Sequence, residues 1–282
     1  MNLLKRALTA AVLLPLLLWL LSCSPQYTLG IVTLAAFLVL YEYGRMVFDA
    51  DANAKANAIG LGVIGGIFVF ATQCASAPQQ IVFLLIFLMI GFLTIILFGG
   101  RYSVRDFERF SAALIGVFYV APALGTLHSL RSYGYGRAEG DVGFAFCVLV
   151  LIVTFTNDTT AYAVGKTVGK RKLWPSVSAQ KTWEGFWGGA AGSVIFSLVF
   201  WWAFSKNNIF SFHLLLLHDI LWVALPCAFL APLGDLLESR IKRFYGLKDS
   251  GAILPGHGGM LDRVDSLLLT APWAFFYVYF LR

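Results

Sequence analysis

The sequence predicts an all-α, polytopic integral membrane protein with about nine transmembrane helices. Hydrophobic residues make up 59% of its 282 residues and charged residues only 13%, whereas about a quarter of the residues are charged in a soluble globular protein. The hydrophobic residues also occur in long runs, close to the ~20 residues that a helix needs to cross a bilayer. Both observations, together with a mean hydropathy of +0.77, exclude a soluble globule.

Nine stretches are long and apolar enough to be spans. The first follows Lys5 and Arg6 and ends near Cys23, a pattern that also resembles a signal peptide, even that of a lipoprotein, although a retained span explains it equally well. The eighth contains Pro226 and Pro232, which a membrane helix tolerates when neighbouring groups satisfy the freed carbonyls. In chain order, the spans cover residues 7–24, 27–47, 57–75, 80–99, 110–129, 142–163, 185–204, 216–236 and 263–281.

The basic residues predict how these spans are oriented. Cytoplasmic loops of membrane proteins carry an excess of Lys and Arg, and the distribution here is strongly uneven if the N-terminus is placed in the cytoplasm. Of the 21 Lys and Arg residues, the outer side then keeps only Arg131, Arg137, Lys206 and Arg282. We therefore expect a cytoplasmic N-terminus and an outer C-terminus.

The polar residues gather in the C-terminal half. We divide the chain into N-terminal transmembrane helices, residues 1–135, and a C-terminal region, residues 136–282, with cytoplasmic loops at 164–184 and 237–262. Residues 239–266 combine basic groups, carboxylates and glycines, a charge density that is costly beside a membrane unless it has partners or a function. Basic groups suit phosphates, carboxylates suit a divalent metal, and glycines let the backbone approach both. We therefore expect a phosphate-handling active site at the cytoplasmic face.

Carboxylates at the ends of spans eight and nine form a candidate metal site. If span eight continues as a helix, residues spaced i, i+3, i+4 and i+7 share one face. These residues are Asp235, Glu238, Ser239 and Lys242. Asp262 and Asp265 lie three residues apart at the start of span nine, so two carboxylate pairs face one compartment and are suited to Mg²⁺. The alternative is that they form salt bridges with Lys242, Arg243 and Arg263.

The loop between these two spans contains a candidate phosphate site. The GHGG sequence at residues 256–259 suits a tight backbone cradle whose amides bind phosphate oxygens. Lys248 and Asp249 precede it in the same loop. His257 fits three roles, as a phosphate donor, a proton carrier or a metal ligand.

A second polar region begins inside span six. Asn157 and Asp158 lie toward its cytoplasmic end, and a carboxylate inside the membrane indicates a function by default. The SAQKTWEG sequence at 178–185 suits a phosphate or nucleotide, although the P-loop spacing is absent. For the basic residues 170–172, anchoring to anionic lipid is the simpler interpretation. Glu42, near the end of span two, is expected to be paired or interfacial.

These motifs resemble those of the phosphatidate cytidylyltransferases, the CDP-diacylglycerol synthases. The segments DTTAYAVGK from Asp158 and SAQKTWEGF from Ser178 are similar to family motifs. Ala179 stands where the family usually has proline and Thr160 where it usually has glycine, which affects the fine geometry more than the reaction class. The N-terminal half agrees only in hydropathy. The family signature agrees at Ser239, Lys242, Arg243, Lys248, Asp249, Gly251, Leu254, Pro255, His257, Gly258, Gly259, Asp262, Arg263 and Asp265.

The resemblance implies an enzyme that transfers CMP from CTP to phosphatidate, giving CDP-diacylglycerol and pyrophosphate for phospholipid biosynthesis. It also implies dependence on Mg²⁺, with a second ion left open. Asp235 and Asp262 are expected to hold the metal, with Glu238, Asp249 and Asp265 as auxiliary ligands. The expected catalytic residues are Asp235, Asp262, Lys242 and His257. The expected substrate-binding residues are Asp158, Ser178, Lys181, Thr182, Ser239, Arg243, Lys248, Asp249, Gly258, Gly259 and Arg263.

The resemblance also implies the partners and the location. We expect CTP, phosphatidate and the lipid bilayer as partners, no nucleic acid, and a bacterial inner (plasma) membrane location; a homodimer is left open. Two alternatives stand beside this function. A CTP-dependent lipid kinase would transfer the γ-phosphate to an alcohol and release CDP. A transporter is the other, but the polar residues crowd one face of the membrane and the two halves show no repeat.

Overall fold

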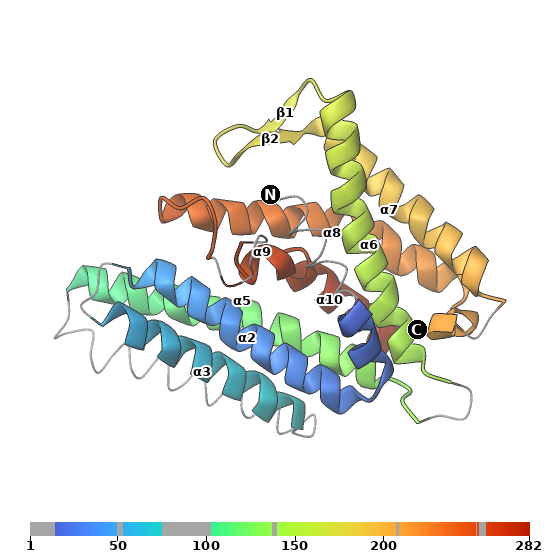
Figure 1. The fold of residues 1–282 in the computed structure, drawn as a ribbon, viewed down its shortest axis with the longest axis horizontal. Coiled ribbons are helices and arrows are strands. Elements are labelled where there is room, and N and C mark those ends of the chain that lie inside the picture. Colours follow the sequence, from blue (N-terminus) through green and yellow to red (C-terminus); the bar gives the residue numbers. More distant parts are fainter. Residues whose placement is uncertain are drawn as a thin grey trace.

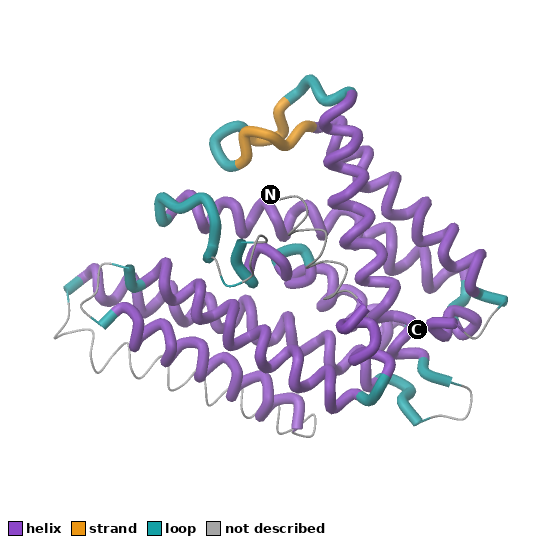
Figure 2. Tube along the Cα trace, viewed as in Figure 1, coloured by secondary structure: helices purple, strands orange, loops and turns teal. Residues whose placement is uncertain are grey.

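The computed structural model describes residues 15–49, 53–74, 103–136, 140–206, 209–251, 253 and 258–282. Over these residues the regular secondary structure is helical apart from one short hairpin (Figures 1 and 2), which confirms the all-α membrane class. Within the described part of the chain, seven helical stretches are long and apolar enough to cross a membrane. They are α2 (Pro25–Val47), α3 (Ala54–Cys74), α5 (Val104–Ser132), α6 (Val142–Thr167), α7 (Trp183–Phe204), α8 (Leu217–Phe244) and the stretch Leu261–Leu281.

These seven stretches match seven of the nine predicted spans. The span predicted at 80–99 lies outside the described residues. The span predicted at 7–24 is described only from residue 15 onward, and residues 15–22 are helical. The total of nine therefore stays a prediction, as does the orientation of the spans.

The last span is not one continuous helix. It consists of α9 (Leu261–Val264), α10 (Leu267–Phe276) and η2 (Tyr277–Leu281), with a break at Asp265 and Ser266. The break lies against α8, because a Cβ atom on Gly234 would lie 2.4 Å from the carbonyl oxygen of Asp265. Only glycine leaves room for this approach.

Helices α9 and α10 lie between two groups of helices (Figure 1). On one side are α2, α3 and α5, which pack together; on the other are α6, α7 and α8. α10 contacts both α5 and α8, and α9 contacts both α2 and α8. Leu268 of α10 belongs to the buried apolar cluster formed with α2, α3 and α5. The N-terminal helices and the C-terminal motif residues are thus packed into one structure.

The two prolines inside α8 are accommodated by side chains of other helices. A proline has no N–H, so Pro232 leaves the carbonyl of Ala228 without its helical partner, and Pro226 does the same to Trp222. The side-chain amide of Asn157 donates to the Ala228 carbonyl at 2.8 Å. The indole N–H of Trp273 donates to the Trp222 carbonyl at 2.9 Å. The prediction that neighbours satisfy the freed carbonyls is confirmed.

Helices α6 and α7 approach closely through glycines of α7. A Cβ atom on Gly185 would lie 2.8 Å from the carbonyl oxygen of Ala161. A Cβ atom on Gly192 would lie 2.5 Å from Oγ1 of Thr160. Small residues permit such close packing between membrane helices. The side chain of Thr160, which departs from the family pattern, therefore fits because it faces a glycine.

The predicted loop at 164–184 contains a hairpin of two short antiparallel strands, β1 (Lys172–Trp174) and β2 (Ser178–Thr182). Its base is held by Glu184, whose carboxylate accepts hydrogen bonds from the backbone N–H groups of Lys170 and Arg171. Arg243 of α8 donates through Nε to the carbonyl of Val177 at 3.4 Å. The hairpin therefore lies beside the end of α8 (Figure 1).

Candidate active site

The end of α8 presents the predicted polar face. Because the helix continues to Phe244, Asp235, Glu238, Ser239 and Lys242 all lie on it. Two contacts at i, i+4 spacing follow the same face. The hydroxyl of Ser239 donates to Oδ1 of Asp235 at 3.4 Å, and Nζ of Lys242 lies 2.5 Å from Oε2 of Glu238. The predicted sharing of one helix face is confirmed.

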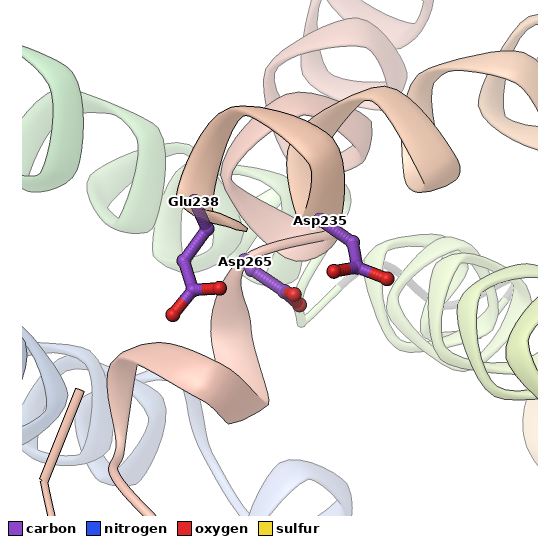
Figure 3. A group of neighbouring side chains, drawn as sticks. All are labelled: Asp235, Glu238 and Asp265. Carbon is purple, nitrogen blue, oxygen red and sulfur yellow. The ribbon is translucent and has the colours of Figure 1, made fainter. Parts of the chain in front are cut away.

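Three carboxylates come together between α8 and the break in the last span. Asp235, Glu238 and Asp265 each offer an oxygen atom, and these atoms lie within 4.8 Å of one another. Figure 3 shows Asp235 and Glu238 projecting from α8, with Asp265 reaching in between them from the chain below. Glu238 and Asp265 are buried. We call Asp235, Glu238 and Asp265 the acidic cluster.

Asp262, predicted as a principal metal ligand, has other partners. Its Oδ1 accepts a hydrogen bond from Nζ of Lys242 at 2.6 Å. Its Oδ2 accepts from the backbone N–H groups of Ser250 at 3.3 Å and Gly259 at 3.0 Å. The Lys242 ammonium thus lies between Asp262 and Glu238, which connects Asp262 to the acidic cluster through a shared cation.

Among the predicted residues of the SAQKTWEG segment, Lys181 reaches the acidic cluster. Its Nζ lies 2.5 Å from Oδ2 of Asp235. Thr182 instead caps α7, where its hydroxyl accepts from the N–H of Gly185 at 3.1 Å. Ser178 pairs with Trp174 across the hairpin. The hairpin therefore brings one lysine from the loop at 164–184 onto the carboxylates of α8.

Two further predicted residues border this site. Asp158 is exposed on α6 and interacts electrostatically with Asp235, Lys181 and Arg263. Arg263 is exposed on α9. Asp158 therefore lies close enough to Asp235 for their charges to interact, and its role in binding substrate stays a prediction.

The remaining predicted residues lie in the last turn of α8 and on the loop that follows it. Arg243 is held by the carbonyl of Leu247 at 2.8 Å, and Lys248 and Asp249 are exposed. Gly258 has a φ of +82°, a left-handed conformation that favours glycine. His257 lies outside the described residues, so its role stays a prediction.

Two residues of the N-terminal helices belong to the site although the sequence motifs did not indicate them. Glu42 of α2 is buried and accepts from the hydroxyl of Ser250 at 3.1 Å and from the N–H of Leu261 at 2.9 Å. The hydroxyl of Tyr119 on α5 is buried, has no hydrogen-bond partner among the described residues, and interacts electrostatically with Asp265 and Glu238. For Glu42 the signal was a carboxylate inside a predicted span; for Tyr119 the sequence held none.

The acidic cluster fits a divalent cation. The atoms it offers as metal ligands are carboxylate oxygens from two chain segments, the ligand type that Mg²⁺ and Ca²⁺ prefer. Oε1 of Glu238 is buried and accepts no hydrogen bond from a donor among the described residues. An unpaired buried carboxylate oxygen is costly, and a bound cation would remove that cost.

Comparisons with known proteins show which family the chain belongs to. The sequence profile described as "Cytidylyltransferase family" matches residues 4–281. A phosphatidate cytidylyltransferase of Bacillus subtilis (strain 168) is 42% identical over 134 residues, which are 48% of this chain and 47% of that protein. One of Staphylococcus aureus (strain COL) is 32% identical over 266 residues, 86% of this chain and 94% of that protein. One of Staphylococcus haemolyticus (strain JCSC1435) is 32% identical over 247 residues, 83% and 87% of the two chains. The chain belongs to the cytidylyltransferase family.

Proposed function

We propose that this protein is a phosphatidate cytidylyltransferase, which converts CTP and phosphatidate into CDP-diacylglycerol and pyrophosphate. A phosphate oxygen of phosphatidate attacks the α-phosphorus of CTP, the bond from that phosphorus to the bridging oxygen breaks, and pyrophosphate leaves with the electron pair. The observation that carries the proposal is the acidic cluster with Lys181 and Lys242 bound to it, at the end of a membrane-spanning helix. The chain is also similar over most of its length to proteins that carry this name.

The residues of this site suit a reaction without a protein nucleophile. The lipid phosphate is already an oxyanion, so catalysis can depend on positioning and on neutralising charge at the phosphates. Lys242 and Lys181 each supply a positive charge directly beside the carboxylates. We assign both lysines to the phosphates of CTP, together with Ser239, which shares a face of α8 with Lys242 and donates to Asp235.

We propose Asp235, Glu238 and Asp265 as ligands of a divalent metal, with Mg²⁺ as the natural ion. When bound, such an ion neutralises phosphate charge and stabilises the leaving pyrophosphate. Asp262 remains a further predicted ligand; its Oδ1 already accepts from Lys242, so in this arrangement it orients that lysine.

The remaining assignments concern the surroundings of the site. Arg243, Lys248 and Arg263 are basic residues of the predicted cytoplasmic side, where they can attract CTP. We place the catalytic region at residues 136–282, supported by Glu42 and Tyr119 from the N-terminal helices. Phosphatidate enters laterally from the bilayer of a bacterial inner membrane, while CTP arrives from the cytosol.

The test is an assay of purified protein in detergent micelles with phosphatidate and CTP labelled separately at the α and γ positions, with and without Mg²⁺. We expect the α label in the lipid product and the γ label in released pyrophosphate, both dependent on the ion. The Asp265→Asn variant should lose at least about a hundredfold in turnover, because it removes an anionic ligand of the proposed ion that neutralises the phosphates. Asp49→Asn, at an exposed position after α2, is the matched control.

The other outcomes are equally informative. The γ label in the lipid would identify a lipid kinase. Transfer from neither position, in protein shown to be folded, would contradict both nucleotide-dependent functions. Near-normal turnover of a folded Asp265→Asn variant would remove Asp265 from the ligand set without changing the reaction assigned.

A further inference from the structure

We propose that Glu42, on a helix far from the signature motif in sequence, is a positioning residue that sets the affinity of the active site for CTP. The inference rests on the proposed function. Glu42 lies on α2 and is 2% exposed. Its Oε2 accepts from the hydroxyl of Ser250 at 3.1 Å and from the N–H of Leu261 at 2.9 Å. One carboxylate oxygen thereby ties Ser250, within the connection between α8 and α9, to Leu261 at the start of α9.

The main chain of this connection passes against the Glu42 side chain at two glycines. A Cβ atom on Gly251 would lie 2.5 Å from Oε1 of Glu42. A Cβ atom on Gly259 would lie 2.6 Å from Oε2 and even closer to the hydroxyl oxygen of Ser250. Side chains at these positions cannot coexist with the carboxylate where it lies, so either the Glu42 side chain or the backbone would have to shift. Both glycines therefore provide room for Glu42, in addition to any role in binding phosphate.

The segment held by Glu42 in turn holds a charged group of the site. The backbone N–H groups of Ser250 and Gly259 both donate to Oδ2 of Asp262. Oδ1 of Asp262 accepts from Lys242, which also pairs with Glu238 of the acidic cluster. A continuous series of hydrogen bonds thus leads from Glu42 to the lysine assigned to the CTP phosphates.

The chemistry of Glu42 indicates more than a packing role. Its Oε1 is buried and has no hydrogen-bond partner among the described residues. Burying a carboxyl group within a membrane-spanning helix costs free energy, and an apolar side chain would fill the same space without that cost. Its contacts go to the connection that carries the signature motif, so we expect its loss to act on nucleotide binding.

The experiment measures KM for CTP, KM for phosphatidate and kcat for Glu42→Ala, Glu42→Gln and Ser250→Ala, per mole of folded protein. Each lost hydrogen bond weakens positioning, so we expect Glu42→Ala to raise KM for CTP about tenfold or more. KM for phosphatidate should stay within about twofold of the unmodified protein, because the bonds lost belong to the nucleotide side of the site. Ser250→Ala removes one bond and should have a smaller effect in the same direction.

Glu42→Gln is the conservative variant. Its amide oxygen can still accept from Ser250 and Leu261, so it should retain most of the affinity for CTP that Glu42→Ala loses. Unchanged KM for CTP in folded Glu42→Ala and Ser250→Ala would overturn the proposal. Equal changes in both KM values, or a loss explained entirely by less folded protein, would show a structural role and also overturn it. Failure of the proposed function is distinguishable, because the unmodified protein would then transfer no α label.

A second measurement tests the contact itself. Gly251→Ala should impair CTP binding because its Cβ meets the Glu42 carboxylate. Glu42→Asp shortens the side chain by one methylene and so moves the carboxylate away from that Cβ. The double variant Glu42→Asp/Gly251→Ala should therefore bind CTP better than the sum of the two single effects predicts. Gly60→Ala is the matched control, since a Cβ at Gly60 meets nothing within 4 Å. Additive effects would contradict the contact on which the proposal depends.

Discussion

At the scale of single residues, the three carboxylates of the acidic cluster have different partners. Asp235 pairs with Lys181 of the hairpin, and Glu238 pairs with Lys242 of its own helix. Oδ1 of Asp265 accepts from the N–H of Ser266 at 2.6 Å. The two lysines therefore come from separate parts of the chain, and each can be removed without removing the other.

We expect Lys181→Met to lower kcat/KM for CTP about tenfold to a hundredfold, because a charge beside the phosphates is lost while the length of the side chain is kept. Lys181→Arg should retain part of the activity, since it keeps the charge. Lys170→Met, at an exposed position before the hairpin, is the control. Steady-state kinetics with labelled CTP measure the effect. Equal activity of the Lys181 and Lys170 variants would remove Lys181 from the site.

At the scale of elements, α8 keeps a helical path through two prolines because other helices complete its hydrogen bonds. The amide of Asn157 is buried on α6 and also lies 3.4 Å from the hydroxyl of Ser193 on α7. Its bond to the carbonyl of Ala228 therefore joins three helices near the acidic cluster. This junction supports the part of α8 that leads to Asp235.

We expect Asn157→Leu to destabilise the protein by about 1–3 kcal/mol, because the carbonyl of Ala228 is left buried without a donor. Pro232→Ala restores a backbone N–H at the position that can donate to that carbonyl. The double variant Asn157→Leu/Pro232→Ala should therefore be more stable than the sum of the single changes predicts. Thermal unfolding in detergent measures all three variants. Strict additivity would show that the amide and the proline are not coupled.

At the scale of the whole molecule, the charged site lies where two groups of helices meet. α9 and α10 contact α2 and α5 on one side and α8 on the other. The hairpin and the connection after α8 lie beside the same end of α8 (Figure 1). The distribution of Lys and Arg predicts that this end faces the cytoplasm, which is where CTP is available.

This orientation predicts the reactivity of single cysteines toward a membrane-impermeant maleimide. Ser176→Cys, in the exposed turn of the hairpin, should be labelled from the cytoplasmic face only. Lys206→Cys, exposed after α7, should be labelled from the outer face only. The background should lack Cys23 and Cys74, which are the partly or fully exposed natural cysteines. Labelling of intact cells reports the outer face, and labelling of inverted vesicles reports the cytoplasmic face. The opposite labelling pattern would show that the protein has the reverse orientation.

Much of the fold could be predicted from the sequence because hydropathy and helix periodicity are local properties. Seven of the predicted spans coincide with helices to within a few residues at most ends, and the continuation of α8 places Asp235 and Lys242 on one face as expected. The departures came from tertiary contacts. The span predicted at 263–281 is found at Leu261–Leu281, but α9 and α10 are interrupted at Asp265 and Ser266, where Gly234 lets the backbone of α8 approach and the Ser266 hydroxyl donates to the carbonyl of Ala231.

The sequence by itself determined the membrane class, the identity of the charged motifs and the family, since these depend on composition and on spacing along the chain. Only the tertiary structure decided which charges meet. It joined Lys181 to Asp235 through a hairpin, grouped Asp265 with Glu238, and directed Asp262 to Lys242. It also brought Glu42 to Ser250, 208 residues away. Such pairings depend on how helices pack in three dimensions, and a pattern of residues along one chain does not contain that information.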